Sequence, residues 1–511
     1  MGDRKHSETL PAGRSAGVCL HLTSLPGPYG IGEIGGDAIG FVDAMRRMGL
    51  TVWQFLPTGP TAFGDSPYQP LSTFAGNEML IDLSDLVARG LLQSDECRVL
   101  AKLPTATVDY AALIPAKFAL LKIAASRFAD KASGQMKTEF DEFLHAEDAL
   151  WLRDFALYRV LKSRNGERPW HDWDARFVHR EAGALQQLEA AAGGEAEQLK
   201  IIQFLFRRQW RRLRDYANSN GISLFGDMPI YIALDSADAW ANPEILEIDR
   251  DGQPQNVAGV PPDYFSADGQ LWGNPLYAWQ VHAANDYRWW VERLRAASAL
   301  VDIVRIDHFR GFEAYWSVPS ECETARDGAW VAGPGDAIFE SLRRQLGHLP
   351  IVAENLGVIT PEVEALRHRY DIPGMTVLQF DVAGKPNPLD VEENCVCYTG
   401  THDNDTTVGW FHGSPDDIRS AEEIRETQRA VLALTGGTPD TIHTDLIRCA
   451  FSTRARLAIA PLQDFLGLGS DARSNIPGTS SGNWRWRFEP EQLTAQCCDE
   501  VAMLVADAGR R

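Results

Sequence analysis

Short apolar runs that lead into an acidic residue recur along this chain. The clearest covers residues 300–311 (LVDIVRIDHFRG), where branched apolar residues crowd together ahead of Gly311, a pattern that predicts a β-strand. Side chains alternate between the faces of a strand, so Arg305 and Asp307 are expected on one face with Val301 and Ile303 behind them. A guanidinium beside a carboxylate favours its ionised form. The run therefore predicts a buried strand that ends in a carboxylate able to act as a nucleophile.

Two other runs place an acid at the corresponding point. Residues 349–357 are apolar up to Glu354, and residues 395–404 bring Asp403 just after their apolar part. Taken alone, the first run is explained equally well by a structural Arg305–Asp307 ion pair. Three acids at three strand ends instead favour an active site, because barrel enzymes carry catalytic residues at the carboxyl ends of parallel strands.

The apolar pattern predicts eight strands, separated by segments with helical spacing. The strands fall within residues 17–22, 52–57, 223–231, 300–311, 349–357, 374–380, 395–404 and 456–462. Eight strands alternating with helices predict an α/β protein: a (β/α)8 TIM barrel with inserted, mainly helical subdomains and no C-terminal β-domain. We expect the barrel in residues 17–85 and 217–488, a helical insertion at 86–216 and a C-terminal helix in 489–511.

Three segments between the strands have distinct helical patterns. Residues 148–162 predict one amphipathic helix. Residues 421–434 predict another, with Ser420 and Glu423 at the spacing of a capping box at its start. The alanine-rich residues 181–200 contain two adjacent glycines and predict a solvated, mobile hairpin of helices.

Two loops have a composition that suits ligand binding. Residues 61–69 (TAFGDSPYQ) follow the second strand and combine glycine, proline and aromatic residues. A long loop over residues 235–279 interleaves prolines and aromatics with Asp, Gln and Asn. Flat rings cover the apolar face of a sugar, while amides and carboxylates bond its hydroxyls. An aromatic cluster in the core is the alternative, but so much Pro, Gly and amide favours a sugar site.

One motif points elsewhere and is set aside. Residues 30–35 (GIGEIG) match the G-x-G-x-x-G dinucleotide fingerprint. That fingerprint needs an acid about 20 residues further on, at the end of the next strand. The next strand, residues 52–57, ends without one, so a nucleotide site is disfavoured.

Composition narrows the class of protein further. A net charge of −21 over 511 residues disfavours binding to nucleic acid or an anionic membrane. No apolar run approaches the ~20 residues of a membrane span, and the N-terminus lacks the apolar core of a signal peptide. The eight cysteines are scattered without a C-x-x-C pair, which favours reduced thiols in the cytoplasm over disulfides or zinc. We expect neither a metal nor a cofactor.

Seven motifs together resemble the amylomaltase family, the 4-α-glucanotransferases also called disproportionating enzymes. The resemblance runs from Thr23 to Trp484. It is carried by GDSPYQ (64–69), GDMPIY (226–231), PPDYF (261–265), LWGNPLY (271–277), RIDHFRG (305–311), AENLG (353–357) and THDN (401–404).

The resemblance implies roles for individual residues. Asp307 would be the nucleophile, Glu354 the general acid/base and Asp403 the transition-state stabiliser of a retaining double displacement through a covalent glycosyl-Asp307 intermediate. The two reacting carboxyls are then expected about 5–5.5 Å apart. Tyr264 and Phe265 would form a lid over the acceptor. The full set of implied substrate-binding residues is Ser66, Tyr68, Asp227, Tyr264, Phe265, Gln270, Trp272, Arg305, His402 and Asn475.

The implied substrates are maltooligosaccharides and other α-1,4-glucans as donors, with glucose or a maltooligosaccharide as acceptor. We expect a monomer or a weak homodimer. Two alternatives stay open: an α-1,4-glucan hydrolase and a catalytically inactive glucan-binding protein. The chain departs from the family at Asn355, where aspartate is common and a change should tune the acid, and at Phe63, where some relatives have tyrosine.

Overall fold

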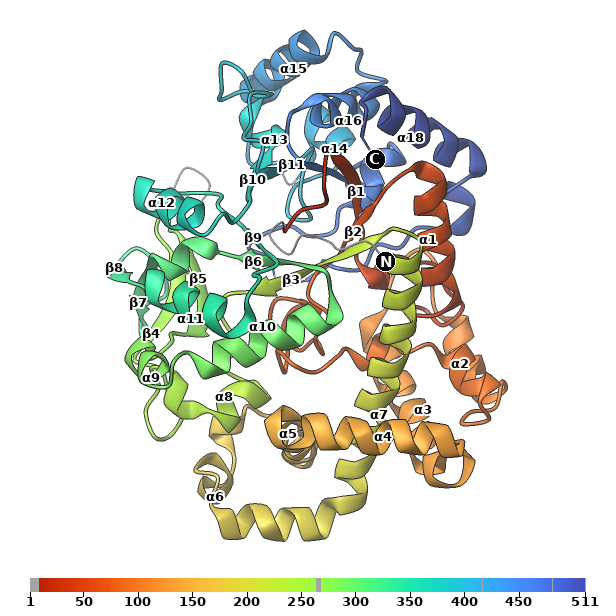
Figure 1. The fold of residues 1–511 in the computed structure, drawn as a ribbon, viewed down its shortest axis with the longest axis vertical. Coiled ribbons are helices and arrows are strands. Elements are labelled where there is room, and N and C mark those ends of the chain that lie inside the picture. Colours follow the sequence, from red (N-terminus) through yellow and green to blue (C-terminus); the bar gives the residue numbers. More distant parts are fainter. Residues whose placement is uncertain (1–8, 263–267, 416, 480, 511) are drawn as a thin grey trace.

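The computed structural model describes residues 9–262, 268–415, 417–479 and 481–510, and an eight-stranded sheet lies at its centre (Figure 1). The strands stand in the order β10-β11-β12-β1-β2-β3-β6-β9, and all neighbouring pairs are parallel. Each overlaps its predicted stretch. Their bounds are β1 Ser15–Cys19, β2 Val52–Gln54, β3 Ser223–Pro229, β6 Ile303–Asp307, β9 Ile351–Ala353, β10 Gly374–Val377, β11 Cys395–Tyr398 and β12 Leu457–Pro461.

Two hydrogen bonds span the seam between the first and last strands of this order, β10 and β9. The Ala353 N–H donates to the Pro373 carbonyl at 2.8 Å. The Met375 N–H donates to the side-chain oxygen of Asn355 at 2.7 Å. The sheet is therefore a nearly closed parallel barrel, and the predicted fold class is confirmed.

Apolar side chains from all eight strands fill the barrel interior, as is usual for this architecture. They alternate with a second set that packs outward against the helices. Leu10 joins the interior cluster from outside the strands. The interior set includes Cys19, Val52, Phe225, Ile303, Val352, Met375, Val396 and Leu457.

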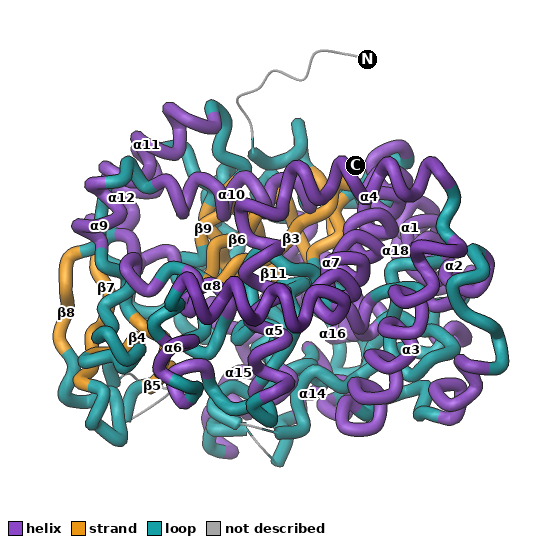
Figure 2. Tube along the Cα trace, turned by 90° about the horizontal axis from the view of Figure 1, so that it is seen from below, coloured by secondary structure: helices purple, strands orange, loops and turns teal. Residues whose placement is uncertain are grey.

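The long loop expected over residues 235–279 instead contains two strands, so that prediction was wrong. β4 (Asn256–Val260) pairs antiparallel with β5 (Gln270–Pro275) and with β7 (Ala314–Pro319), which pairs with β8 (Ala329–Ala332). Figures 1 and 2 place this small sheet at one side of the barrel. Its register depends on β7, which follows β6 in the chain, so local sequence does not reveal the pairing.

Between β2 and β3 the chain is mostly helical, and these helices lie below the barrel in Figure 1. Residues 148–152 form a π-helical turn that runs into α5, so the predicted amphipathic stretch is helical. The helices are α2 Leu83–Ala88, α3 Tyr110–Lys131, α4 Gly134–Glu147, α5 Arg153–Arg164, α6 Ala175–Val178 and α7 Ala182–Ser219.

The hairpin predicted over residues 181–200 is wrong, because α7 continues as a single helix through Gly193 and Gly194. Each glycine costs up to about 1 kcal/mol relative to alanine inside a helix. Leu188 and Leu199 nevertheless lie buried on either side of the pair, in one apolar cluster with Phe155 of α5. Tertiary packing of this stripe outweighs the local cost.

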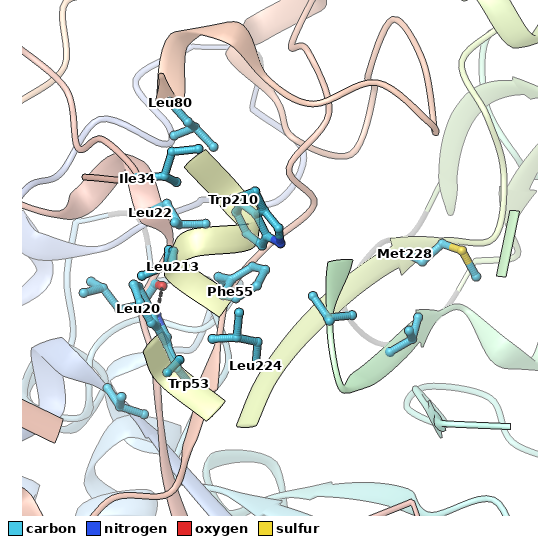
Figure 3. Close-up of a cluster of buried hydrophobic side chains, with 14 of the residues drawn as sticks. Leu20, Leu22, Ile34, Trp53, Phe55, Leu80, Trp210, Leu213, Leu224 and Met228 are labelled. Carbon is cyan, nitrogen blue, oxygen red and sulfur yellow. Dashed lines mark hydrogen bonds between the residues drawn. The ribbon is translucent and has the colours of Figure 1, made fainter. Parts of the chain in front are cut away.

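The C-terminal half of α7 anchors the insertion on the barrel (Figure 3). Trp210 of α7 packs edge-on against Phe55, with ring centroids 5.5 Å apart, and Phe55 packs against Trp53 in the same way at 6.0 Å. Trp53 donates its indole N–H to the Leu20 carbonyl at 2.9 Å. Leu213 of α7 joins this cluster (Figure 3). The insertion and the barrel therefore share one continuous core.

The remaining helices surround the barrel. The predicted capping box is confirmed: the Ser420 side chain accepts from the Glu423 N–H, and the Glu423 side chain accepts from the Ser420 N–H. No helix among the described residues is both long and apolar enough to cross a membrane. The helices are α1 Gly36–Met48, α8 Ala237–Ala241, α9 Trp279–Ala284, α10 Arg288–Leu300, α11 Asp336–Leu346, α12 Pro361–Arg369, α13 Leu378–Asp381, α14 Thr407–His412, α15 Ala421–Thr435, α16 Ile442–Ser452, α17 Leu462–Phe465 and α18 Ala495–Asp507.

Candidate active site

The interior face of β6 carries the first two predicted site residues. Ile303 lies in the apolar interior, and Arg305 and Asp307 follow it at alternate positions. Nη2 of Arg305 lies 2.8 Å from Oδ1 of Asp307. The expectation that Arg305 and Asp307 share a face, with Ile303 behind them, is confirmed. Val301 was expected on the same face, but it lies before β6 and packs in the apolar cluster outside the barrel interior, so that part of the prediction was wrong.

Arg305 also bonds a second carboxylate. Its Nη1 donates to Oδ1 and Oδ2 of Asp227 at 2.8 and 2.7 Å. Asp227 faces it because β3 and β6 pair with these two residues in register. The side chain of Asp227 is fully buried, whereas that of Asp307 is 32% exposed. Arg305 is therefore the common charge partner of one closed carboxylate and one open carboxylate.

The loop over residues 61–69 reaches this pair through Tyr68. The Tyr68 hydroxyl donates to Oδ2 of Asp227 at 2.8 Å and lies 2.8 Å from Nε2 of His402. The rings of Tyr68 and His402 stack with centroids 5.2 Å apart. Four predicted binding residues, Tyr68, Asp227, Arg305 and His402, thus form one connected network.

Glu354 lies directly after β9, beside the end of β6. Its Oε1 accepts the Leu356 N–H at 2.7 Å, and its Oε2 accepts the His308 N–H at 2.8 Å. Burial raises the pKa of Glu354 to about 7; the charge of Asp307 adds to the rise, and Arg305 opposes it. At neutral pH this carboxyl therefore exists in both protonation states, which suits a group that must both give and take a proton.

On balance, the surroundings of Asp403 favour its ionised form, unlike those of Glu354. Its Oδ1 accepts from Nδ2 of Asn475 at 2.6 Å, and its Oδ2 lies 3.3 Å from Nε2 of His402. Burial acts to raise the pKa of Asp403, but the charge of His402 and the hydrogen bonds from His402 and Asn475 outweigh it and lower the pKa. Burial likewise opposes protonation of His402, and Asp403 overcomes it, so the pKa of His402 is raised. The two side chains therefore each favour the charged form of the other.

The other predicted binding residues lie around the same groove. Ser66 accepts the Tyr68 N–H at 3.2 Å, and the Trp272 indole donates to the Gln270 side chain at 3.1 Å. Ser66, Gln270, Trp272 and Asn475 all line the groove. Tyr264 and Phe265 lie outside the described residues, as does the side chain of Phe63, so the lid stays a prediction.

The groove is large and extends well beyond the acids. Its volume is about 1660 Å³, and Asp307, Glu354 and Asp403 all line it. The helical insertion also lines it, for example through Phe118 of α3 and Gln198 of α7. A groove of this size accommodates a chain of several sugars rather than a single small molecule.

Sequence reasoning missed two residues that shape the site. His308 adopts a left-handed conformation with φ 56°, which places its N–H on Glu354 and its ring 4.7 Å from that of Trp272. Trp484 packs 6.0 Å from the ring of Tyr68. His308 lies within the RIDHFRG motif and Trp484 at the end of the family resemblance, but periodicity gave no reason to single them out.

One group of potential metal ligands lies among the described residues, away from the acids. Ligand atoms of Glu364, His368 and Glu392 lie within 4.8 Å of one another. The guanidinium of Arg367 already bonds both carboxylates, at 2.5 Å and 2.8 Å. A cation in that position disfavours a second one, and the group has the form of a surface ion-pair network.

The fold and the groove define a barrel enzyme of the kind that works on glycosidic bonds, with paired carboxyls at the carboxyl ends of its strands. The family model described as 4-alpha-glucanotransferase matches residues 20–494. The chain therefore belongs to the 4-alpha-glucanotransferase family, as its motifs suggested.

Relatives match over nearly the full length. The chain is 44% identical to the 4-alpha-glucanotransferase of Thermus thermophilus, over 94% of this chain and 96% of that one. It is 45% identical to the Synechocystis 4-alpha-glucanotransferase, over 98% of each. The amylomaltase from Streptococcus agalactiae, solved in complex with acarbose, superposes with a TM-score of 0.91 at 36% identity, over 97% of this chain and 99% of that one.

Proposed function

We propose that this enzyme moves α-1,4-glucan segments between maltooligosaccharides by a retaining double displacement at Asp307. The observation that carries the proposal is the contrast between two neighbouring carboxyls. Asp307 is paired with Arg305 at 2.8 Å and open to the groove, whereas burial raises the pKa of Glu354 to about 7. The Asp307 side chain is placed to attack from the groove, whereas a carboxyl with a pKa near 7 can both give and take a proton.

In the first step a carboxylate oxygen of Asp307 forms a bond to the anomeric carbon of the donor. The bond from that carbon to the leaving sugar breaks, and Glu354 gives its proton to the departing oxygen. The product is a glycosyl ester of Asp307, with Glu354 ionised. We define the donor side of the groove by the Tyr68, Asp227 and His402 network, which would bond the donor sugar.

In the second step the acceptor 4-hydroxyl gives its proton to Glu354 and attacks the anomeric carbon. The ester bond to Asp307 breaks, which restores both carboxyls and inverts the centre a second time. Asp403, ionised between His402 and Asn475, would bond sugar hydroxyls more strongly as positive charge builds on the ring.

Transfer rather than hydrolysis requires that water be kept from the ester. We assign that task to the lid predicted at Tyr264 and Phe265. The barrel of residues 17–85 and 217–488 would carry the chemistry. The insertion of residues 86–216, whose helices α3, α5 and α7 all line the groove, would extend the binding surface.

The cellular setting follows from the same proposal. All eight cysteines are free, which agrees with a reducing compartment such as the cytoplasm. The substrates would be maltodextrins derived from glycogen or starch, with glucose or a maltooligosaccharide as acceptor. We expect the protein to act as a monomer or a weak homodimer.

Digestion of pure maltotriose tests the proposal. A transferase gives a ladder of shorter and longer glucans with a constant number of reducing ends. Release of glucose and maltose alone, with a rising count of reducing ends, would instead identify an α-1,4-glucan hydrolase. Absence of any turnover by a folded preparation would support an inactive glucan-binding protein.

A further inference from the structure

Several exposed apolar side chains line the groove. Leu271, Trp330, Val358 and Phe380 are all among the exposed large hydrophobic residues of the chain, and all four line the groove. Soluble proteins scatter such residues singly, so a group of them in one concave site marks a place where something binds.

Trp330 is the largest of these side chains, and neighbouring side chains hold its ring. The guanidinium carbon of Arg310 lies 3.7 Å from the centroid of its ring, a close cation–π contact. Arg310 is itself buried, and its other nitrogens bond the Val358 and Ala314 carbonyls. Trp316 packs edge-on against Trp330 at 5.2 Å. The ring is therefore held in place although it remains 40% exposed.

The contacts of Trp330 link it to the chain segments that follow Asp307 and Glu354. Arg310 follows Asp307 by three residues, and Val358 follows Glu354 by four. The proton donor Glu354 must face the leaving sugar, so the wall formed by residues 356–358 lies on the acceptor side of the groove. Trp272 packs on His308, the residue next to Asp307, whereas Trp330 packs on Arg310, three residues after Asp307. A sugar bound directly at the acids would thus meet Trp272 first, and Trp330 only further along.

We infer that Trp330 is a specificity-determining residue on which the second or third sugar of an acceptor glucan stacks. This inference rests on the proposed function and adds to it a preference for long acceptors. An indole face matches the apolar face of a glucose unit, and a ring already held by Arg310 loses little freedom on binding. Glucose, which occupies only the first acceptor position, would not reach it.

A structural role for the indole is the competing explanation, and β8 supplies a control for it. Val331 is the next residue on the same edge strand, and its side chain points to the opposite face. It is exposed to a similar extent, 38%, and is not among the described residues that line the groove. Val331→Ala therefore changes the same strand but leaves the Trp330 ring, on which the acceptor sugar is proposed to stack, intact.

The test uses α-maltosyl fluoride as donor, because fluoride leaves without occupying the acceptor side. Transfer to glucose and to maltotetraose is measured over a range of acceptor concentrations. We expect Trp330→Ala to raise the KM for maltotetraose about tenfold and to leave the KM for glucose within twofold. Trp330→Phe should keep most of the maltotetraose affinity because it retains a flat ring, whereas Trp330→Met should not. Val331→Ala should change neither value.

Equal effects on glucose and maltotetraose, or none on either, would overturn the inference. If Trp330→Ala does not fold, the comparison of Trp330→Phe with Trp330→Met decides the question. Equal KM values for maltotetraose in those two variants would also overturn it. Wild-type enzyme that releases fluoride but transfers to no acceptor would overturn the proposed transferase function, and this inference with it.

Discussion

The two sides of the groove are built from opposite kinds of residue. On the donor side, Tyr68, Asp227 and Arg305 are polar groups bonded to one another, and Asp227 is fully buried. On the proposed acceptor side, Trp330 is apolar and exposed. A preorganised polar network acts on charge that develops at one position, whereas apolar surface tolerates sliding and different chain lengths. Donor-side substitutions should therefore lower kcat, and acceptor-side substitutions should raise acceptor KM.

The largest effect is expected from Asp307→Asn, which changes the proposed nucleophile between the donor and acceptor sides. An amide cannot form the ester, so transfer from maltotriose should fall by roughly 10⁴-fold or more. The protein should still fold, because the side chain is partly exposed and keeps its shape. Turnover is measured together with the thermal midpoint. Near-wild-type turnover by a preparation free of wild-type enzyme would remove Asp307 from the mechanism.

Asp227→Asn should give the next largest effect. It removes the charge that balances Arg305 in a buried site, and Arg305 is left with Asp307 as its carboxylate partner. We expect a loss of about 10²–10³-fold in kcat/KM on maltotriose, or roughly 3–4 kcal/mol. Loss of the hydrogen bond from Tyr68 should also lower the thermal midpoint.

Asp302→Asn is the matched control at the opposite end of β6. Asp302 pairs with Arg214 at 3.0 Å and accepts the Leu224 N–H at 2.8 Å, far from the strand ends that carry the acids. It should lower stability with little change in kcat/KM. If both variants lose activity in proportion to their stability, the donor-side network has no special catalytic part.

The pH profile should come from Glu354. The first step needs its protonated form, so kcat/KM should fall about tenfold per pH unit above pH 7, since the pKa is raised to about 7. The raised pKa of Glu354 also makes the stability depend on pH, because the folded state holds more protons than the unfolded state between pH about 4.5 and 7. This group therefore lowers stability as pH rises through that window.

The Glu354→Gln variant shows whether Glu354 causes the fall in kcat/KM above pH 7. His402 also has a raised pKa, so the profile alone does not separate the two groups. On α-maltosyl fluoride, whose leaving group needs no proton, the variant should retain much of its glycosylation rate and show no limb near pH 7. If the rate of the variant still falls near pH 7, the titrating group is His402 rather than Glu354.

The barrel could be predicted from sequence because its signal is local. Each strand is a short apolar run with its own turn signals, and all eight overlap their predicted stretches. The sheet of β4, β5, β7 and β8 could not, because β4 pairs with a strand that comes after β6. The continuous α7 was missed for a related reason, since local glycines suggested a break that packing against α5 overrides.

The site divides in the same way. The acids were predictable because each ends an apolar run, and the contacts of Tyr68 and His402 with Asp227 and Asp403 now join the predicted residues. His308 was not, because its part depends on a left-handed backbone that turns its N–H toward Glu354. The seat of Trp330 on Arg310 likewise depends on the antiparallel sheet that sequence did not reveal.

The smallest effect on activity is expected from Asn355→Asp, which restores the residue common in the family. Nδ2 of Asn355 donates to Oε1 of Glu364 at 2.7 Å, while its oxygen accepts the Met375 N–H across the barrel seam. Aspartate loses the donor and places two carboxylates side by side. We expect about 1–2 kcal/mol of lost stability at pH 7, less at pH 4.5 where one acid takes up a proton, and kcat/KM within fivefold. Urea unfolding at both pH values measures the loss.

The double variant Asn355→Asp with Glu364→Gln reverses the donor and acceptor and should regain part of the stability. A hundredfold loss of kcat/KM without loss of stability would show instead that residue 355 acts on the neighbouring Glu354.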